Sequence, residues 1–189
     1  MPGIGVNTAI VREDRILLTL RHDWEVWCLP GGAVEPDESL AQAAIRETRE
    51  EVGLDVRLTR LVGLYSRNGW IDHGLHVAVF AAEIADDCLR RSYRTGGELA
   101  LQQGEVLEAR WFARHALPEA MLFGHPQRAL DALAGVSGAV WYHDSEWPFA
   151  PGLTRRELYN LCERSGLSSA EFYRQFVGKP GPGGSRLEV

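Results

Sequence analysis

One stretch of the sequence carries most of the information about fold and chemistry: GGAVEPDESLAQAAIRETREEVGL, over residues 31–54. Residues 39–52 have the pattern of an amphipathic helix. Ser39 is a suitable N-cap for this helix, and Gly53 is a typical stop signal. The stretch therefore predicts a glycine-rich turn, a short loop and one well-defined helix.

The predicted helix carries three acidic residues, Glu47, Glu50 and Glu51, at i, i+3 and i+4. This spacing puts three carboxylates on one face, where each like-charged pair repels by about 0.2–0.5 kcal/mol. A hard divalent cation removes that repulsion, because Mg²⁺ prefers carboxylate oxygens. The alternative is a solvated acidic face. A second face can pack on a sheet, and its residues are Ala41, Ile45, Thr48 and Val52.

The residues that flank the three glutamates favour the metal site. Gly31 and Gly32 can bring a backbone carbonyl close to the acidic face. Glu38 follows six residues after Gly32, and Arg46 follows eight residues after Glu38. Arg46 can therefore reach back to Glu38 as a charged brace.

The complete pattern resembles the Nudix box, the signature of the Nudix hydrolase family. It reads Gly32, five residues, Glu38, seven residues, and then Arg46-Glu47-Thr48-Arg49-Glu50-Glu51-Val52-Gly53. The one departure is Thr48, where the family usually has an aliphatic residue. Because Thr48 belongs to the packing face, the departure concerns helix docking more than catalysis. The resemblance covers about residues 3–134.

The resemblance implies hydrolysis of a diphosphate linkage in a nucleoside diphosphate derivative or a nucleoside triphosphate. It implies that the three box glutamates bind one or more Mg²⁺ or Mn²⁺ ions, completed by the carbonyl of Gly32. Arg46 would act in catalysis by bracing the loop through Glu38. The alternative is a non-catalytic Nudix-like module that senses or binds nucleotides.

The general base and the substrate contacts are open at this stage. Glu50 is one candidate base, and Glu105, which precedes a predicted strand, is the other, ahead of Glu98. Arg21, at the end of a predicted strand, can contact a phosphate. Trp27 and Trp70 can stack on a base. Nucleoside triphosphates, oxidised ones included, and nucleotide-sugar-like diphosphates are the preferred substrate classes.

The rest of the chain predicts an α/β (α+β) fold in which a mixed β-sheet lies between helices, an α/β/α sandwich with a C-terminal helical extension. Strands are predicted over residues 4–11, 16–20, 55–65, 75–84 and 106–112, and a helix over residues 126–133. We divide the chain into a Nudix hydrolase domain (1–135), an extension (136–178) that packs on the core, caps the site or forms a homodimer interface, and a flexible tail (179–189).

Composition limits the remaining possibilities. The net charge of -6 argues against a nucleic-acid partner, because nucleic-acid binding needs clustered positive charge. No signal sequence or run of about 20 apolar residues is present, which argues against a membrane partner. The three cysteines form no CxxC pair, which fits a reducing compartment. We therefore expect a cytoplasmic enzyme with a small-molecule nucleotide substrate.

Overall fold

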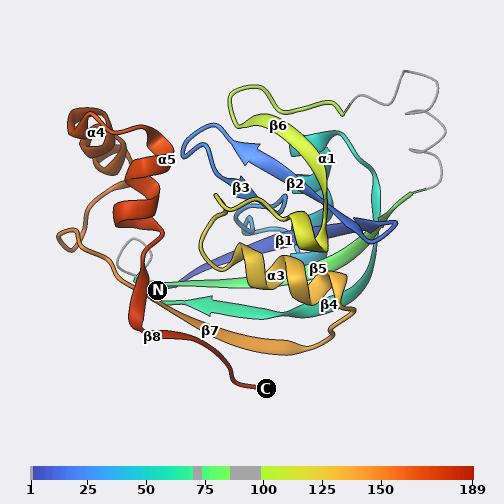
Figure 1. The fold of residues 1–189 in the computed structure, drawn as a ribbon. Helices are drawn as coiled ribbons and strands as arrows, with labels where there is room; N and C mark the ends of the chain where they lie inside the picture. The colour runs from blue at the N-terminus through green and yellow to red at the C-terminus, as the bar shows by residue number, and fades with distance from the viewer. Residues whose placement is uncertain (1, 70–73, 86–98) are drawn as a thin grey trace.

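A computed structural model describes residues 2–69, 74–85 and 99–189 (Figure 1). Its strands are β1 (Gly3–Arg12), β2 (Arg15–Arg21), β3 (Trp27–Cys28), β4 (Val56–Arg67), β5 (Leu75–Ile84), β6 (Val106–Ala113), β7 (Ala139–Ser145) and β8 (Pro180–Leu187). Its helices are α1 (Leu40–Val52), η1 (Arg114–Ala116), α3 (His125–Leu133), α4 (Arg155–Ser165), α5 (Ser169–Phe172) and the π-helical turn η2 (Tyr173–Val177).

The strands form a mixed sheet, as the sequence predicted. Its order is β3-β2-β1-β5-β4-β7-β8, and β6 pairs with β2. The β1–β5 and β4–β7 pairs are parallel, whereas the other pairs are antiparallel. Within the described ranges, no helix is long and apolar enough to cross a bilayer.

Helices α1 and α3 cover opposite faces of the sheet (Figure 1). Side chains alternate along a strand, so neighbouring residues of β1 point to different helices. Val6 packs with Ala43 and Ala44 of α1. Ala9 lies in the cluster that contains Ala129 of α3. The α/β/α sandwich expected from the sequence is therefore confirmed.

Helix α1 has the predicted caps. The Ser39 hydroxyl accepts a hydrogen bond from the Gln42 amide at 3.2 Å, and the Gln42 side chain accepts one from the Ser39 amide at 2.8 Å. Gly53 ends the helix with φ 69°. Thr48 is fully buried and donates to the Ala44 carbonyl at 2.7 Å, so its hydroxyl is satisfied inside the packing face.

The packing face is rotated slightly from the predicted one. Thr48 and Val52 are buried as expected, and Ile45 is half-buried. Ala41, however, is exposed, while Ala44 is fully buried against the sheet. This rotation brings Glu51 inward, where only 5% of its surface is exposed.

The C-terminal residues differ from the expectation of a flexible tail. Residues 180–187 form β8, which pairs with β7 in the main sheet. The glycines that suggested flexibility instead allow the backbone of this segment to lie close to Asp144 of β7. A Cβ on Gly181 would lie 2.5 Å from a carboxylate oxygen of Asp144, and the Gly183 amide donates to that carboxylate at 2.7 Å.

The extension also packs on the core domain. β7 pairs with β4, so the chain after residue 135 continues the sheet. The C-terminal helices, red in Figure 1, enclose a second apolar cluster that includes Leu158, Phe172 and Tyr173. Trp24 and Val26, from the loop between β2 and β3, complete this cluster. The extension is therefore built onto a loop of the N-terminal half.

Candidate active site

A cavity of about 770 Å³ lies beside the end of β2 and the C-terminal half of α1. The predicted site residues that line it are Arg21, Gly32, Glu47, Glu51 and Glu105. They come from a strand end, a turn, a helix and a loop, so the fold gathers residues that lie far apart in the sequence. Glu38, Arg46 and Glu50 do not belong to the lining.

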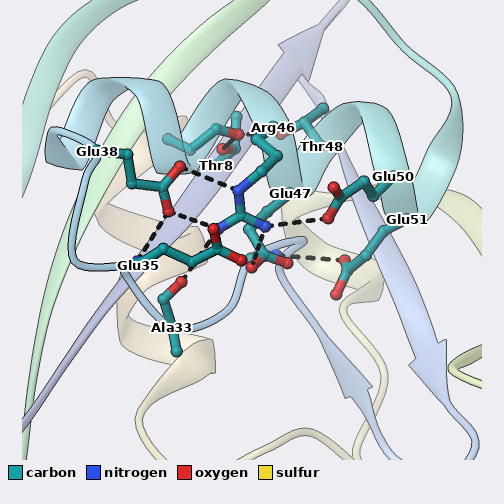
Figure 2. Close-up of polar contacts among 11 residues, drawn as sticks. Thr8, Ala33, Glu35, Glu38, Arg46, Glu47, Thr48, Glu50 and Glu51 are labelled. Atoms are coloured by element: carbon teal, nitrogen blue, oxygen red, sulfur yellow. Dashed lines mark hydrogen bonds and ion pairs between the residues drawn. The ribbon is translucent and has the colours of Figure 1, made fainter.

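Arg46 organises the loop behind the cavity (Figure 2). Its Nε and Nη2 donate to the two carboxylate oxygens of Glu38 at 3.0 and 2.6 Å. Its Nη1 donates to Glu47 at 2.9 Å and to Glu50 at 3.0 Å, and its Nη2 also reaches the Ala33 carbonyl at 3.2 Å. The contact between Arg46 and Glu38 that the sequence predicted is present, and Arg46 also fixes two of the box glutamates.

Gly32 and Glu47 lie in direct contact. A Cβ on Gly32 would lie 2.6 Å from one carboxylate oxygen of Glu47 and 2.7 Å from the other. The Gly32 carbonyl accepts a hydrogen bond from the Val6 amide at 2.9 Å, which ties the turn to β1. A carbonyl has two lone pairs, so this oxygen can accept one further bond.

Glu51 is a buried carboxylate that forms no ion pair within 4 Å among the described residues, although the charge of Arg21 acts on it. Its one hydrogen-bond donor among the described residues is the Gly31 amide at 3.2 Å. Burial raises the pKa of Glu51 to about 8, with smaller raising contributions from the charges of Glu47 and Glu105, against the Gly31 hydrogen bond and the charge of Arg21, which lower it. Burial likewise raises the pKa of Glu47, against the influence of Arg46. A carboxylate in this position needs a positive charge to stay ionised at neutral pH.

The donor set fits a hard divalent cation. Glu47, Glu51 and Gly32 line the same cavity, and they carry the carboxylate and carbonyl oxygens that such an ion prefers. Glu50 is placed differently: its side chain is 49% exposed and is paired with Arg46. In the described part of the chain, no three acidic, histidine or cysteine side chains are already gathered around one point. An ion here would therefore rely on the backbone carbonyl and water as well as on carboxylates.

The predicted substrate contacts have mixed outcomes. Arg21 lines the cavity, but its Nε and Nη2 are held by Asp23 at 2.8 and 2.7 Å. Trp27 does not line the cavity, because its half-buried ring packs edge-on against Phe112 with the centroids 4.8 Å apart. Trp70 lies outside the described residues, as does Glu98.

Several lining residues were not singled out from the sequence. Arg128 of α3 is 3% exposed and donates from Nη1 to the Asn7 side chain at 2.8 Å. Burial lowers its pKa to about 10. Arg155 and Tyr159 of α4 line another part of the cavity and contact Asp23. No local motif marks these residues, because only the packing of α3 and α4 brings them to the cavity.

Comparisons with known proteins agree with this geometry. The NUDIX domain family model matches residues 1–133. A protein of Bacillus subtilis (strain 168), provisionally named an 8-oxo-dGTP diphosphatase, is 34% identical over 82% of this chain and 96% of its own length. The crystal structure of a MutT NUDIX hydrolase from Burkholderia pseudomallei is 26% identical, with TM-score 0.58, over 72% of this chain and 99% of that one. A NUDIX hydrolase from Nitrosomonas europaea shares the fold with TM-score 0.63, at 22% identity over 76% of this chain and 79% of that one.

Proposed function

Since the chain belongs to the NUDIX family and is a pyrophosphohydrolase of nucleotide derivatives, we propose that its substrates are nucleoside triphosphates, oxidised ones included, and that its metal is Mg²⁺. The observation that carries the proposal is the joint lining of one cavity by Glu47, Glu51 and Glu105. The Bacillus subtilis relative supports the triphosphate class, because its match spans 156 residues and so extends beyond the family domain. The alternative of a non-catalytic binding module is set aside.

We assign the metal site to Glu47, Glu51 and the Gly32 carbonyl, with Glu50 joining when Arg46 releases it. Glu51 supports this assignment because it is buried, and burial raises its pKa despite the charge of Arg21. A bound Mg²⁺ would neutralise charge on the diphosphate oxygens and help to position the attacking water. Arg46 is a positioning residue in this scheme, since it holds the Glu47 carboxylate and does not line this cavity.

Glu105 is the general base that we propose. It lines the cavity beside Glu47 and Glu51, whereas Glu50 points to Arg46. The Glu105 carbonyl accepts a hydrogen bond from the His22 amide at 2.9 Å, which holds this part of the loop to the end of β2. A carboxylate in this position can take a proton from water as the water attacks phosphorus.

The proposal is tested by turnover of a nucleotide panel with Mg²⁺, with products identified by mass. The panel contains the common and 8-oxo nucleoside triphosphates, ADP-ribose and a nucleotide sugar. We expect triphosphates to be hydrolysed fastest, with loss of turnover in Glu51→Gln and a drop of about 10²-fold or more in Glu105→Gln. Unchanged turnover in both variants would contradict the mechanism, and preference for a diphosphate sugar would contradict the substrate class. The free, buried thiols of Cys28 and Cys162 support a cytoplasmic location, which cell fractionation would test.

A further inference from the structure

Helix α4 of the extension forms part of the substrate cavity. Arg155 and Tyr159 line the cavity that also contains Glu47, Glu51 and Glu105. Both α4 residues lie beyond residue 133, where the match to the family domain ends. This wall therefore lies outside the common domain.

Asp23 connects this wall to the domain. Its Oδ1 accepts from Arg21 Nε at 2.8 Å. Its Oδ2 accepts from Arg21 Nη2 at 2.7 Å, from Arg155 Nη2 at 3.0 Å and from the Tyr159 hydroxyl at 3.0 Å. One carboxylate thus faces two guanidinium groups, so the cluster of Arg21, Asp23 and Arg155 keeps a net positive charge.

The two arginines, Arg21 and Arg155, bind Asp23 with different numbers of hydrogen bonds. Arg21 makes the paired, two-oxygen contact and its side chain is 27% exposed. Arg155 shares a single oxygen with other donors, and its side chain is 57% exposed. Its Nε donates to the Tyr159 hydroxyl at 2.7 Å, and its Nη1 has no hydrogen-bond acceptor among the residues that the structure describes. Arg155 therefore retains a donor for a further acceptor, and it shares the single negative charge of Asp23 with Arg21 at the cavity wall.

We propose that Arg155 binds a phosphate group of the nucleotide substrate, so that the C-terminal extension supplies an anion-binding residue to the active site. The inference rests on the proposed function and names a residue for it. A planar guanidinium matches phosphate oxygens with two parallel hydrogen bonds. Glu47 and Glu51 repel a polyphosphate until metal binds, and a cation on the wall formed by α4 offsets this repulsion. Asp23 and Tyr159 position the guanidinium.

Arg156 provides a matched control, because it is the next residue of α4, is exposed and does not line the cavity. We expect Arg155→Gln to raise the KM of a nucleoside triphosphate about tenfold, with kcat within about twofold. We expect Arg156→Gln to leave both constants at the wild-type values. The KM of Arg155→Lys should lie between those of Arg155→Gln and wild type, because lysine keeps the positive charge but cannot donate two parallel hydrogen bonds.

A binding measurement separates this inference from the proposed function. Calorimetry with Mg²⁺ and α,β-methylene-dGTP should show about tenfold weaker binding to Arg155→Gln than to Arg156→Gln. Equal KM and Kd in these two variants would overturn the inference. So would a lower Tm of Arg155→Gln with unchanged KM and Kd, because Arg155 would then only hold α4 in place.

The remaining outcomes are also decisive. Absence of wild-type turnover on the panel would refute the proposed function, while the comparison of analogue binding would still decide the role of Arg155. Absence of wild-type binding to the analogue would overturn the inference as well. If Arg155→Gln does not fold, the pair Arg155→Lys and Arg156→Lys repeats the comparison with the charge kept, and equal Kd values there would overturn the inference.

Discussion

Replacement of Gly32 by alanine tests the contact between the glycine turn and the acidic helix. The new Cβ would lie 2.6 Å from a carboxylate oxygen of Glu47, whereas an ordinary contact begins at 3.4 Å. The Glu47 carboxylate must therefore retreat by roughly 0.8 Å from 2.6 to 3.4 Å. The backbone of Gly32 does not have the positive φ that would strain alanine, so the substitution acts through the side chain.

The expected loss is large in activity and small in stability. A misplacement of about 1 Å at a reacting centre costs about 10²-fold, which corresponds to about 2.7 kcal/mol of transition-state stabilisation. Glu47 can move because its carboxylate is the far end of a flexible side chain. Gly31→Ala should instead have its main effect on stability. Its Cβ would collide with the Val6 carbonyl, and Gly31 has a φ of 142°, which alanine rarely adopts. We therefore expect the free energy of unfolding to fall by about 3 kcal/mol.

The assay combines kcat/KM with urea unfolding in a double-mutant cycle. Gly32→Ala should reduce kcat/KM about 10²-fold and change the unfolding free energy by less than about 1 kcal/mol. In a Glu47→Gln background, Gly32→Ala should reduce kcat/KM by a much smaller factor, because the displaced side chain no longer carries a negative charge. Wild-type kcat/KM in Gly32→Ala, or an equal loss in both backgrounds, would refute the reasoning.

Three further predictions concern the site and the core. Glu51→Gln should abolish turnover. It should leave the metal-free protein at least as stable as wild type, because it replaces a buried carboxylate by a neutral amide. Thermal melts should then show that Mg²⁺ raises the Tm of the wild type only. Tyr65→Phe removes a 2.7 Å hydrogen bond to the buried Asp131 and should lower the unfolding free energy by about 1–3 kcal/mol in urea titrations; an unchanged midpoint would contradict this. Burial lowers the pKa of His143 to about 4 from 6.5, so the unfolded chain binds the extra proton and stability should fall as the pH drops from 6.5 to 4. In His143→Phe this loss should be smaller than in wild type when unfolding is followed across that range.

The sequence predicted the box because its information is local. Helix periodicity and the two caps depend on residues a few positions apart, so the bounds of α1 and the contact between Arg46 and Glu38 could be foreseen. Trp27 shows the limit of this reasoning. Its side chain faces Phe112 of β6, and the pairing of β2 with β6 that brings them together is not encoded near either residue.

The sequence by itself therefore determined the reaction class, the bounds of the acidic helix that we propose to bind metal, and the existence of a mixed sheet. Only the tertiary structure decided which glutamates face the cavity, since a small rotation of α1 buries Glu51 and leaves Glu50 with Arg46. The tertiary structure also placed the extension. Trp24 packs in the apolar cluster of the C-terminal helices, and this packing holds α4 where Arg155 lines the cavity. Those contacts join residues more than a hundred positions apart, and burial of apolar surface rather than any local pattern selects them.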